Sequence, residues 1–97
     1  MEIRIQSVKF DADQKLVDFV NKKVIKLKRF FDNIILAEVV LSFTPDHDNK
    51  KVHIRLNIPG NELVIDRNAK TFEKAVRECV NILKQQLKKT KEKMRRH

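Results

Sequence analysis

Five basic residues near the C-terminus recur at helical spacing. Arg77, Lys84, Lys88, Lys91 and Arg95 are separated by seven, four, three and four positions. At about 100° per residue they fall within roughly 60° of one another, in one stripe about 27 Å long. Such a stripe can follow the phosphates of a nucleic acid, because phosphate oxygens attract ammonium and guanidinium groups whatever the base sequence.

A second basic stripe is predicted upstream. Lys15, Lys22, Lys26 and Arg29 share one face of a helix, and Lys23 flanks it. A rigid helix that presents cations on successive turns can hold a phosphate backbone, and an arginine can grip a phosphate with two parallel hydrogen bonds. The candidate RNA-binding residues are Lys22, Lys23, Lys26, Arg29, Lys84, Lys88, Lys89, Lys91, Lys93 and Arg95.

All of the excess positive charge lies in two segments. The net charge is +9; residues 69–97 hold ten Lys or Arg and three Glu, and residues 13–31 hold six Lys or Arg and two Asp. The remainder of the chain is slightly acidic. Like charges repel in a compact protein, so this concentration favours a polyanionic partner. Two explanations for these lysines need no partner: the helix face is simply solvated, or lysines near the C-terminus complement the helix dipole.

No set of residues predicts catalysis. His47 lies between Asp46 and Asp48 in a stretch typical of a surface turn, and Cys79 lies in an apolar helical pattern, which is typical of a buried structural thiol. The single glycine, Gly60, excludes a glycine-rich phosphate loop. We therefore expect no enzymatic activity, no metal, no cofactor and no small-molecule substrate.

The aromatic residues are all phenylalanines. At least five of them fall on predicted core faces, namely Phe19, Phe30, Phe31, Phe43 and Phe72. A sheet with exposed aromatic residues, which some RNA-binding domains use to stack bases, is not predicted. We therefore expect recognition through shape and phosphates rather than through base stacking.

Six segments would position the two stripes. Strict alternation of apolar and polar residues predicts strands, and apolar residues at spacings of three and four predict helices. Asp11 or Asp13 can cap the first helix and Thr71 the second. The predicted elements are a strand over 2–8, a helix to about 31, strands over 35–43 and 51–58, a short strand at 63–65, and a helix over about 72–93.

The order β-α-β-β-β-α predicts an α+β fold. A four-stranded mixed sheet with both helices packed on one face buries every apolar face, as in double-stranded-RNA-binding domains. The length suits one domain over residues 1–97, with residues 94–97 as a basic tail. One cysteine and no secretory signal or membrane span favour a cytoplasmic protein.

The chain resembles the short ribosome hibernation promoting factors, also called ribosome-associated translation inhibitors. The resemblance covers nearly the whole chain, including the strand start at residues 1–5 and the paired Phe30-Phe31. The family's last helix typically has Leu, then Gln-Leu, then alternate lysines, here Leu83, Gln86-Leu87, Lys89, Lys91 and Lys93. A family Asp in this helix is replaced by Arg77, and an Arg is replaced by Gln85.

The resemblance implies binding to ribosomal RNA of the small subunit, in the channel of messenger and transfer RNA. The protein would inhibit translation and protect idle ribosomes, as part of the stress response of stationary phase. The family's basic positions are matched best by Lys23, Lys26, Lys89, Lys91 and Lys93. Long relatives carry a second domain that pairs ribosomes, so we expect any pairing here to need a separate dimerising factor.

Two other functions stay open at this point. A generic double-stranded RNA-binding protein would use the same basic helices. A protein-interaction module, for example a transcription regulator, would instead use the outer face of the sheet around His53 and Arg55. A role at a membrane surface is not expected, because the basic helices commit their apolar faces to the core.

Overall fold

The elements follow one another in the predicted order β-α-β-β-β-α. The computed structural model describes residues 1–95, with side chains described for residues 1–93. A short 3-10 helix, η1, continues the first helix. The elements are β1 (Glu2–Ser7), α1 (Gln14–Ile25), η1 (Lys26–Arg29), β2 (Leu36–Phe43), β3 (Lys50–Ile58), β4 (Asn61–Ala69) and α2 (Phe72–Arg95).

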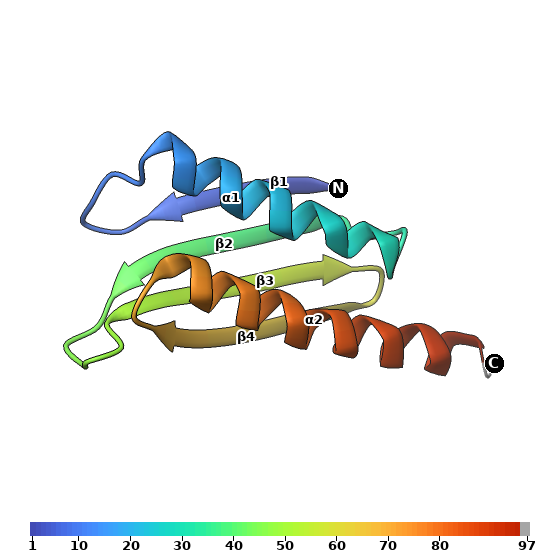
Figure 1. Ribbon diagram of the computed structural model, residues 1–97. Coiled ribbons are helices and arrows are strands. Elements are labelled where there is room, and N and C mark those ends of the chain that lie inside the picture. The colour runs from blue at the N-terminus through green and yellow to red at the C-terminus, as the bar shows by residue number, and fades with distance from the viewer. Residues whose placement is uncertain (96–97) are drawn as a thin grey trace.

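The four strands form one mixed sheet in the order β1-β2-β3-β4. β1 runs parallel to β2, since a helix connects them, whereas β2, β3 and β4 are joined by hairpins and run antiparallel. Both helices lie on the same face of the sheet (Figure 1). The predicted α+β fold is therefore confirmed. No helix within residues 1–95 is long and apolar enough to cross a membrane.

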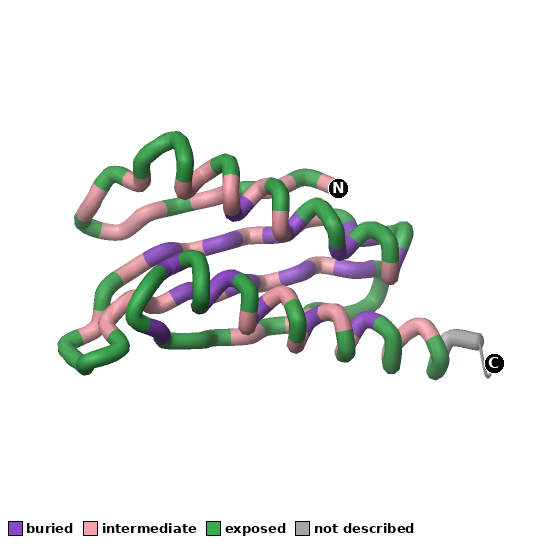
Figure 2. Tube along the Cα trace, viewed as in Figure 1, coloured by how far each residue is buried: buried purple, intermediate pink, exposed green. Residues whose placement is uncertain are grey.

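The core lies between the sheet and the two helices (Figure 2). Alternate residues of β2 and β3 point into it, and the helices contribute one face each, as their periodicity predicts. Nineteen hydrophobic residues are buried, and no polar or charged residue of the described chain is. Leu27, Leu56, Leu83 and Leu87 are fully buried. This packing fixes the two basic helices relative to each other.

Both helices begin at the predicted polar caps. The N–H of Leu16 donates to Oδ1 of Asp13 at 2.8 Å, so Asp13, and not Asp11, caps α1. The N–H of Lys74 donates to Oγ1 of Thr71 at 3.1 Å at the start of α2. Each side-chain oxygen satisfies a backbone donor that has no partner within its own helix.

The predicted continuous helix to Phe31 was wrong in its last turns. α1 ends at Ile25, and η1 tightens the chain until the N–H of Phe30 donates to the carbonyl of Leu27 at 3.0 Å. Tightening of this kind is common at helix ends, where the last carbonyls lack partners four residues on. Phe31 is buried at 6% exposure, but Phe30 is only half-buried.

The predicted short fourth strand was also wrong. β4 pairs along all of β3, from Asn61 opposite Ile58 to Ala69 opposite Lys50. An edge strand pairs through its backbone, so its many polar side chains weaken the sequence pattern without weakening the ladder. The tight turn before it is confirmed at residues 59–60, where Gly60 has φ of 73°, a conformation that favours glycine.

Two residues expected on the apolar face of β2 are exposed. Ile35 precedes the strand and is 59% exposed, and Phe43 ends it and is 47% exposed. Both lie at the ends of the sheet, where less of the structure covers the face. Phe43 still contacts Phe10 and Phe72, with ring centroids 4.9 and 5.6 Å away.

Cys79 is fully buried on the sheet-facing side of α2, as predicted, and burial raises the pKa of its thiol to about 12. We expect the native protein at about pH 8 to react with a thiol reagent about a thousandfold more slowly than the chain in concentrated urea, because the thiolate is the reactive species. Absorbance of the released chromophore measures both rates. Equal rates would contradict this burial.

The same pKa predicts how alkali affects folding. A raised pKa favours the neutral thiol in the folded state, so its contribution to stability is complete below about pH 9 and is lost as pH rises toward about 12. A Cys79→Ala variant removes this contribution and is the control.

Candidate nucleic-acid interface

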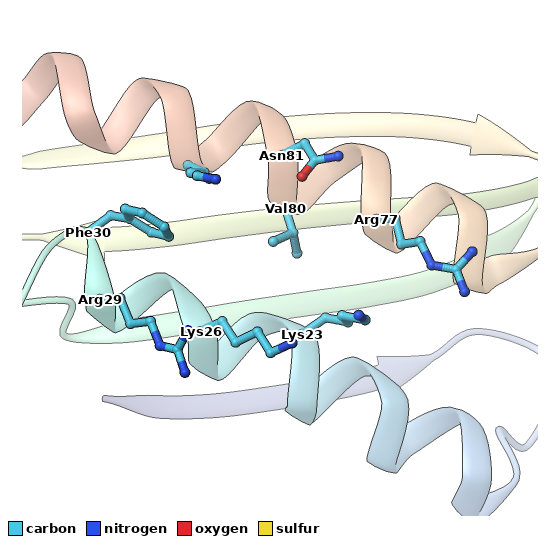
Figure 3. Close-up of a pocket in the computed structure, with 8 residues that line it drawn as sticks. Lys23, Lys26, Arg29, Phe30, Arg77, Val80 and Asn81 are labelled. Carbon is cyan, nitrogen blue, oxygen red and sulfur yellow. The ribbon is translucent and has the colours of Figure 1, made fainter.

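A groove runs between the two helices on the side away from the sheet. Its larger hollow has a volume of about 340 Å³. Figure 3 shows the basic side chains of α1 and η1 on one wall and those of α2 on the other. The hollow is lined by Lys23, Lys26, Arg29, Phe30, Arg77, Val80, Asn81 and Lys84.

A smaller hollow of about 260 Å³ continues the groove toward the end of α2. Arg29 and Phe30 line both hollows, which makes the two contiguous, and Lys88, Lys91 and Glu92 complete the smaller one. Seven basic residues therefore lie along one groove. We call them the groove cations: Lys23, Lys26, Arg29, Arg77, Lys84, Lys88 and Lys91.

Two half-buried phenylalanines each contact two of the groove cations. The guanidinium of Arg77 lies 5.3 Å and Nζ of Lys23 5.6 Å from the ring centre of Phe19. Nζ of Lys84 and of Lys88 lie 5.0 and 5.3 Å from the ring centre of Phe30. The electron-rich ring face attracts a cation, so each ring gathers positive charge onto the groove.

The groove cations crowd one another across the two helices. The pKa of Lys23 is lowered chiefly by the charge of Lys26, then by partial desolvation, by Arg77 on the opposite helix and by Lys22. All four ion pairs among the described side chains lie on the sheet, so no carboxylate within residues 1–93 pairs with a groove cation. Positive charge left uncompensated in this way attracts an external anion.

The outer face of the sheet differs in its electrostatics. Arg55 lies 2.5 Å from Glu38, and Nδ1 of His53 lies 2.5 Å from Oδ1 of Asp66, each pair standing opposite across neighbouring strands. The hydrogen bond from Arg55 lowers the pKa of Glu38, and that bond raises the pKa of Arg55. Because these side chains pair with each other across the strands, the outer face of the sheet offers little unpaired charge to a partner.

The structure brings together six of the ten predicted residues. Lys23, Lys26, Arg29, Lys84, Lys88 and Lys91 line the groove. Lys22, Lys89 and Lys93 are exposed and line neither hollow. The side chain of Arg95 lies outside the described residues. Of the predicted tail at residues 94–97, the backbone of residues 94 and 95 belongs to α2, and residues 96 and 97 lie outside the described residues. Among the described residues no group of three His, Cys, Asp or Glu side chains could hold a metal ion.

Five residues that line the two hollows were absent from the predicted site: Phe30, Arg77, Val80, Asn81 and Glu92. Arg77 belongs to the predicted stripe, but it was not among the predicted RNA-binding residues. Phe30 was assigned to the core, since its spacing fits the apolar face. Asn81 belongs to no motif or periodic pattern in the sequence that would have marked it as a binding residue. The spacing of Arg77, seven residues before Lys84, was the one usable signal.

Comparison with known families identifies the chain. The family described as sigma 54 modulation protein / S30EA ribosomal protein matches residues 3–95. The chain belongs to this family. Among curated relatives, the ribosome hibernation promoting factor of Pseudomonas putida is 30% identical over 93 residues, which cover 96% of this chain and 89% of that protein. The factor of Azotobacter vinelandii is 29% identical, with 96% and 85% covered.

Solved structures share the fold. The N-terminal domain of Protein Y from Thermus thermophilus matches with a TM-score of 0.83 and 24% identity, over 93% of this chain and 99% of that one. A ribosomal subunit interface protein from Coxiella burnetii matches with a TM-score of 0.84 and 21% identity, over 94% and 98%. Both structures therefore share the arrangement of sheet and helices described above.

Proposed function

We propose that the protein is a ribosome hibernation factor that binds ribosomal RNA of the small subunit in the channel of messenger and transfer RNA. It inhibits translation by occupying that channel, and it protects idle ribosomes in the cytoplasm. It acts as a stoichiometric binder, without turnover. Membership of the S30EA family and the names of its curated relatives support this function.

The observation that carries the proposal is the groove itself. Cations from α1, η1 and α2 meet along one line, and no described carboxylate pairs with them. A line of cations of this kind suits a phosphate backbone, because phosphate oxygens attract ammonium and guanidinium groups whatever the base sequence. The outer sheet face, with its charges paired internally, gives less support to the protein-interaction alternative.

The geometry also explains how binding would inhibit. An elongated body of 45 × 24 × 18 Å presents one long basic side. Seated in an RNA-walled channel, that side would face ribosomal phosphates, and the bulk of the sheet would occupy space that other RNAs need. No chemical step is required.

Binding should depend steeply on salt. If about five groove cations contact phosphates, affinity for the small subunit should fall about 100- to 1000-fold between roughly 50 and 200 mM salt, because bound counterions are released. Co-sedimentation with purified subunits through a sucrose gradient, at a series of salt concentrations, measures the slope. Subunits preloaded with messenger and initiator transfer RNA should bind far less protein.

An isolated RNA duplex is the necessary comparison. Affinity for a duplex equal to that for the small subunit would favour a generic double-stranded RNA-binding protein. Absence of the protein from the subunit fractions at low salt would overturn the proposal. An affinity that does not change with salt concentration would instead indicate that the outer face of the sheet binds a protein.

A further inference from the structure

We propose that the larger hollow of the groove holds one unpaired nucleotide of the bound RNA strand, with its base against Phe30 and its flanking phosphates on the groove cations. The inference rests on the proposed function in taking RNA as the ligand. It adds a contact to a base, where the sequence predicted recognition of phosphates and shape alone.

The shape of the site favours a single nucleotide. A volume of about 340 Å³ falls at the lower end of the range for small-molecule pockets. A paired helix presents its phosphates on a convex surface and would span such a hollow, leaving it empty. A base turned out of its stack is flat and narrow enough to enter, and proteins that recognise RNA strands commonly receive bases in this way.

The residues that line the larger hollow offer both apolar surface and hydrogen-bonding groups to a base. Phe30 and Val80 are half-buried and give an apolar surface from opposite walls (Figure 3). Asn81 is exposed at the rim, and its amide carries both a donor and an acceptor for a base edge. An aromatic ring that serves only the core would be covered, whereas part of the Phe30 surface stays open.

The phosphates on either side of the base have partners ready. Lys23, Lys26, Arg29, Arg77 and Lys84 line the same hollow, and none of its lining residues is acidic. Lys84 and Lys88 now rest over Phe30 through weak cation–π contacts. Their flexible side chains can swing from the ring to phosphate oxygens as the base arrives, so the base and the phosphates are bound together.

The test uses a fluorophore at the site. The sequence has no Trp and no Tyr, so Phe30→Trp places the only indole of the protein in the hollow. A short unstructured RNA strand should quench this fluorescence. The same strand lacking its bases, a duplex of equal length, and adenosine monophosphate should quench it far less. Equal quenching by the abasic strand, or by the free nucleotide, would overturn the assignment.

A matched control is available at Phe43. Like Phe30 it has a lysine over its ring, with Nζ of Lys50 at 4.9 Å, but it is exposed and lies at the end of β2, outside the groove. The indole of Phe43→Trp should not respond to the strand. A response equal to that of Phe30→Trp would indicate nonspecific contact and contradict the proposal.

Affinity gives a second readout. Phe30→Leu keeps an apolar side chain and should weaken binding of the strand about 5- to 100-fold, the range for loss of one aromatic stack. Duplex binding and the salt slope should be unchanged, since every cation remains. Asn81→Ala, at an exposed position, should leave the melting temperature unaltered and lower the preference among bases. Unchanged strand affinity in Phe30→Leu would overturn the base contact.

The two proposals can fail separately. If the protein binds the small subunit through the groove cations and Phe30→Leu binds normally, the nucleotide site is wrong and the hibernation function stands. If strands quench the indole of Phe30→Trp but no protein sediments with subunits, the proposed ribosomal function is wrong.

Discussion

Reversing the charge of Lys26 and Lys84 together is expected to weaken binding to the small subunit about 100-fold or more. Both residues line the larger hollow, Lys26 from η1 and Lys84 from α2. Each charged hydrogen bond to a phosphate contributes about 1.5–3 kcal/mol, and a glutamate at the same place repels the phosphate as well. Co-sedimentation with purified subunits measures the loss.

Stability should not suffer in this double variant. Lys26 is the main cause of the lowered pKa of Lys23, so replacing it by a carboxylate removes a repulsion. The melting temperature should therefore stay the same or rise slightly. A drop in both binding and melting temperature would mean that the variant had lost its fold, and the binding result would then not bear on the groove.

The matched control reverses Lys70 and Lys74. Both are exposed, Lys70 just before α2 and Lys74 in its first turn; they line neither hollow and belong to none of the described ion pairs. The control changes the net charge by the same amount, so it tests whether position or total charge matters. We expect a loss of less than about fivefold, through long-range attraction alone. Equal losses in the two variants would refute a localised track.

The second large effect is on stability. Leu83→Ala should lower the free energy of unfolding by about 3–4 kcal/mol, because Leu83 is fully buried between α2 and the sheet and its loss leaves a cavity. A chain of this size has a total stability of about 5–15 kcal/mol. The melting temperature should fall by roughly 12–30 °C. Thermal and urea unfolding followed by circular dichroism measure the change.

Gln85→Ala is the control for Leu83→Ala. Gln85 is exposed on the same helix, and alanine raises helix propensity at both positions. Its effect should stay within about 0.5 kcal/mol. A small effect of Leu83→Ala would mean that α2 is not anchored where the structure has it. Since α2 carries four groove cations, that result would also undermine the groove.

Most of the fold could be predicted because buried residues recur in the sequence with the period of a helix or a strand. Alternation marked β1, β2 and β3, and the apolar spacing marked both helices. The caps Asp13 and Thr71 were readable since only a few side chains can satisfy a helix start. β4 was underestimated because an edge strand needs no alternation to pair, and η1 because a tightened last turn depends on the packing around it.

The site was predictable in its charge but not in its form. The cations of each helix could be counted and placed on faces, so six of the ten predicted residues do line the groove. That Arg77 stands beside Lys23, and that Phe30 opens into a hollow, depends on how the helices pack against each other. Spacing within one helix carries no information about its neighbour.

By itself the sequence determined the element order, the buried faces and the concentration of positive charge on two helices. These follow from local periodicity and composition, which each segment carries alone. Only the tertiary structure decided that both basic faces meet in one groove, that this groove is hollow, and that two phenylalanines gather its cations. Those features depend on the angle and distance between α1 and α2, which are set by the shared core beneath them.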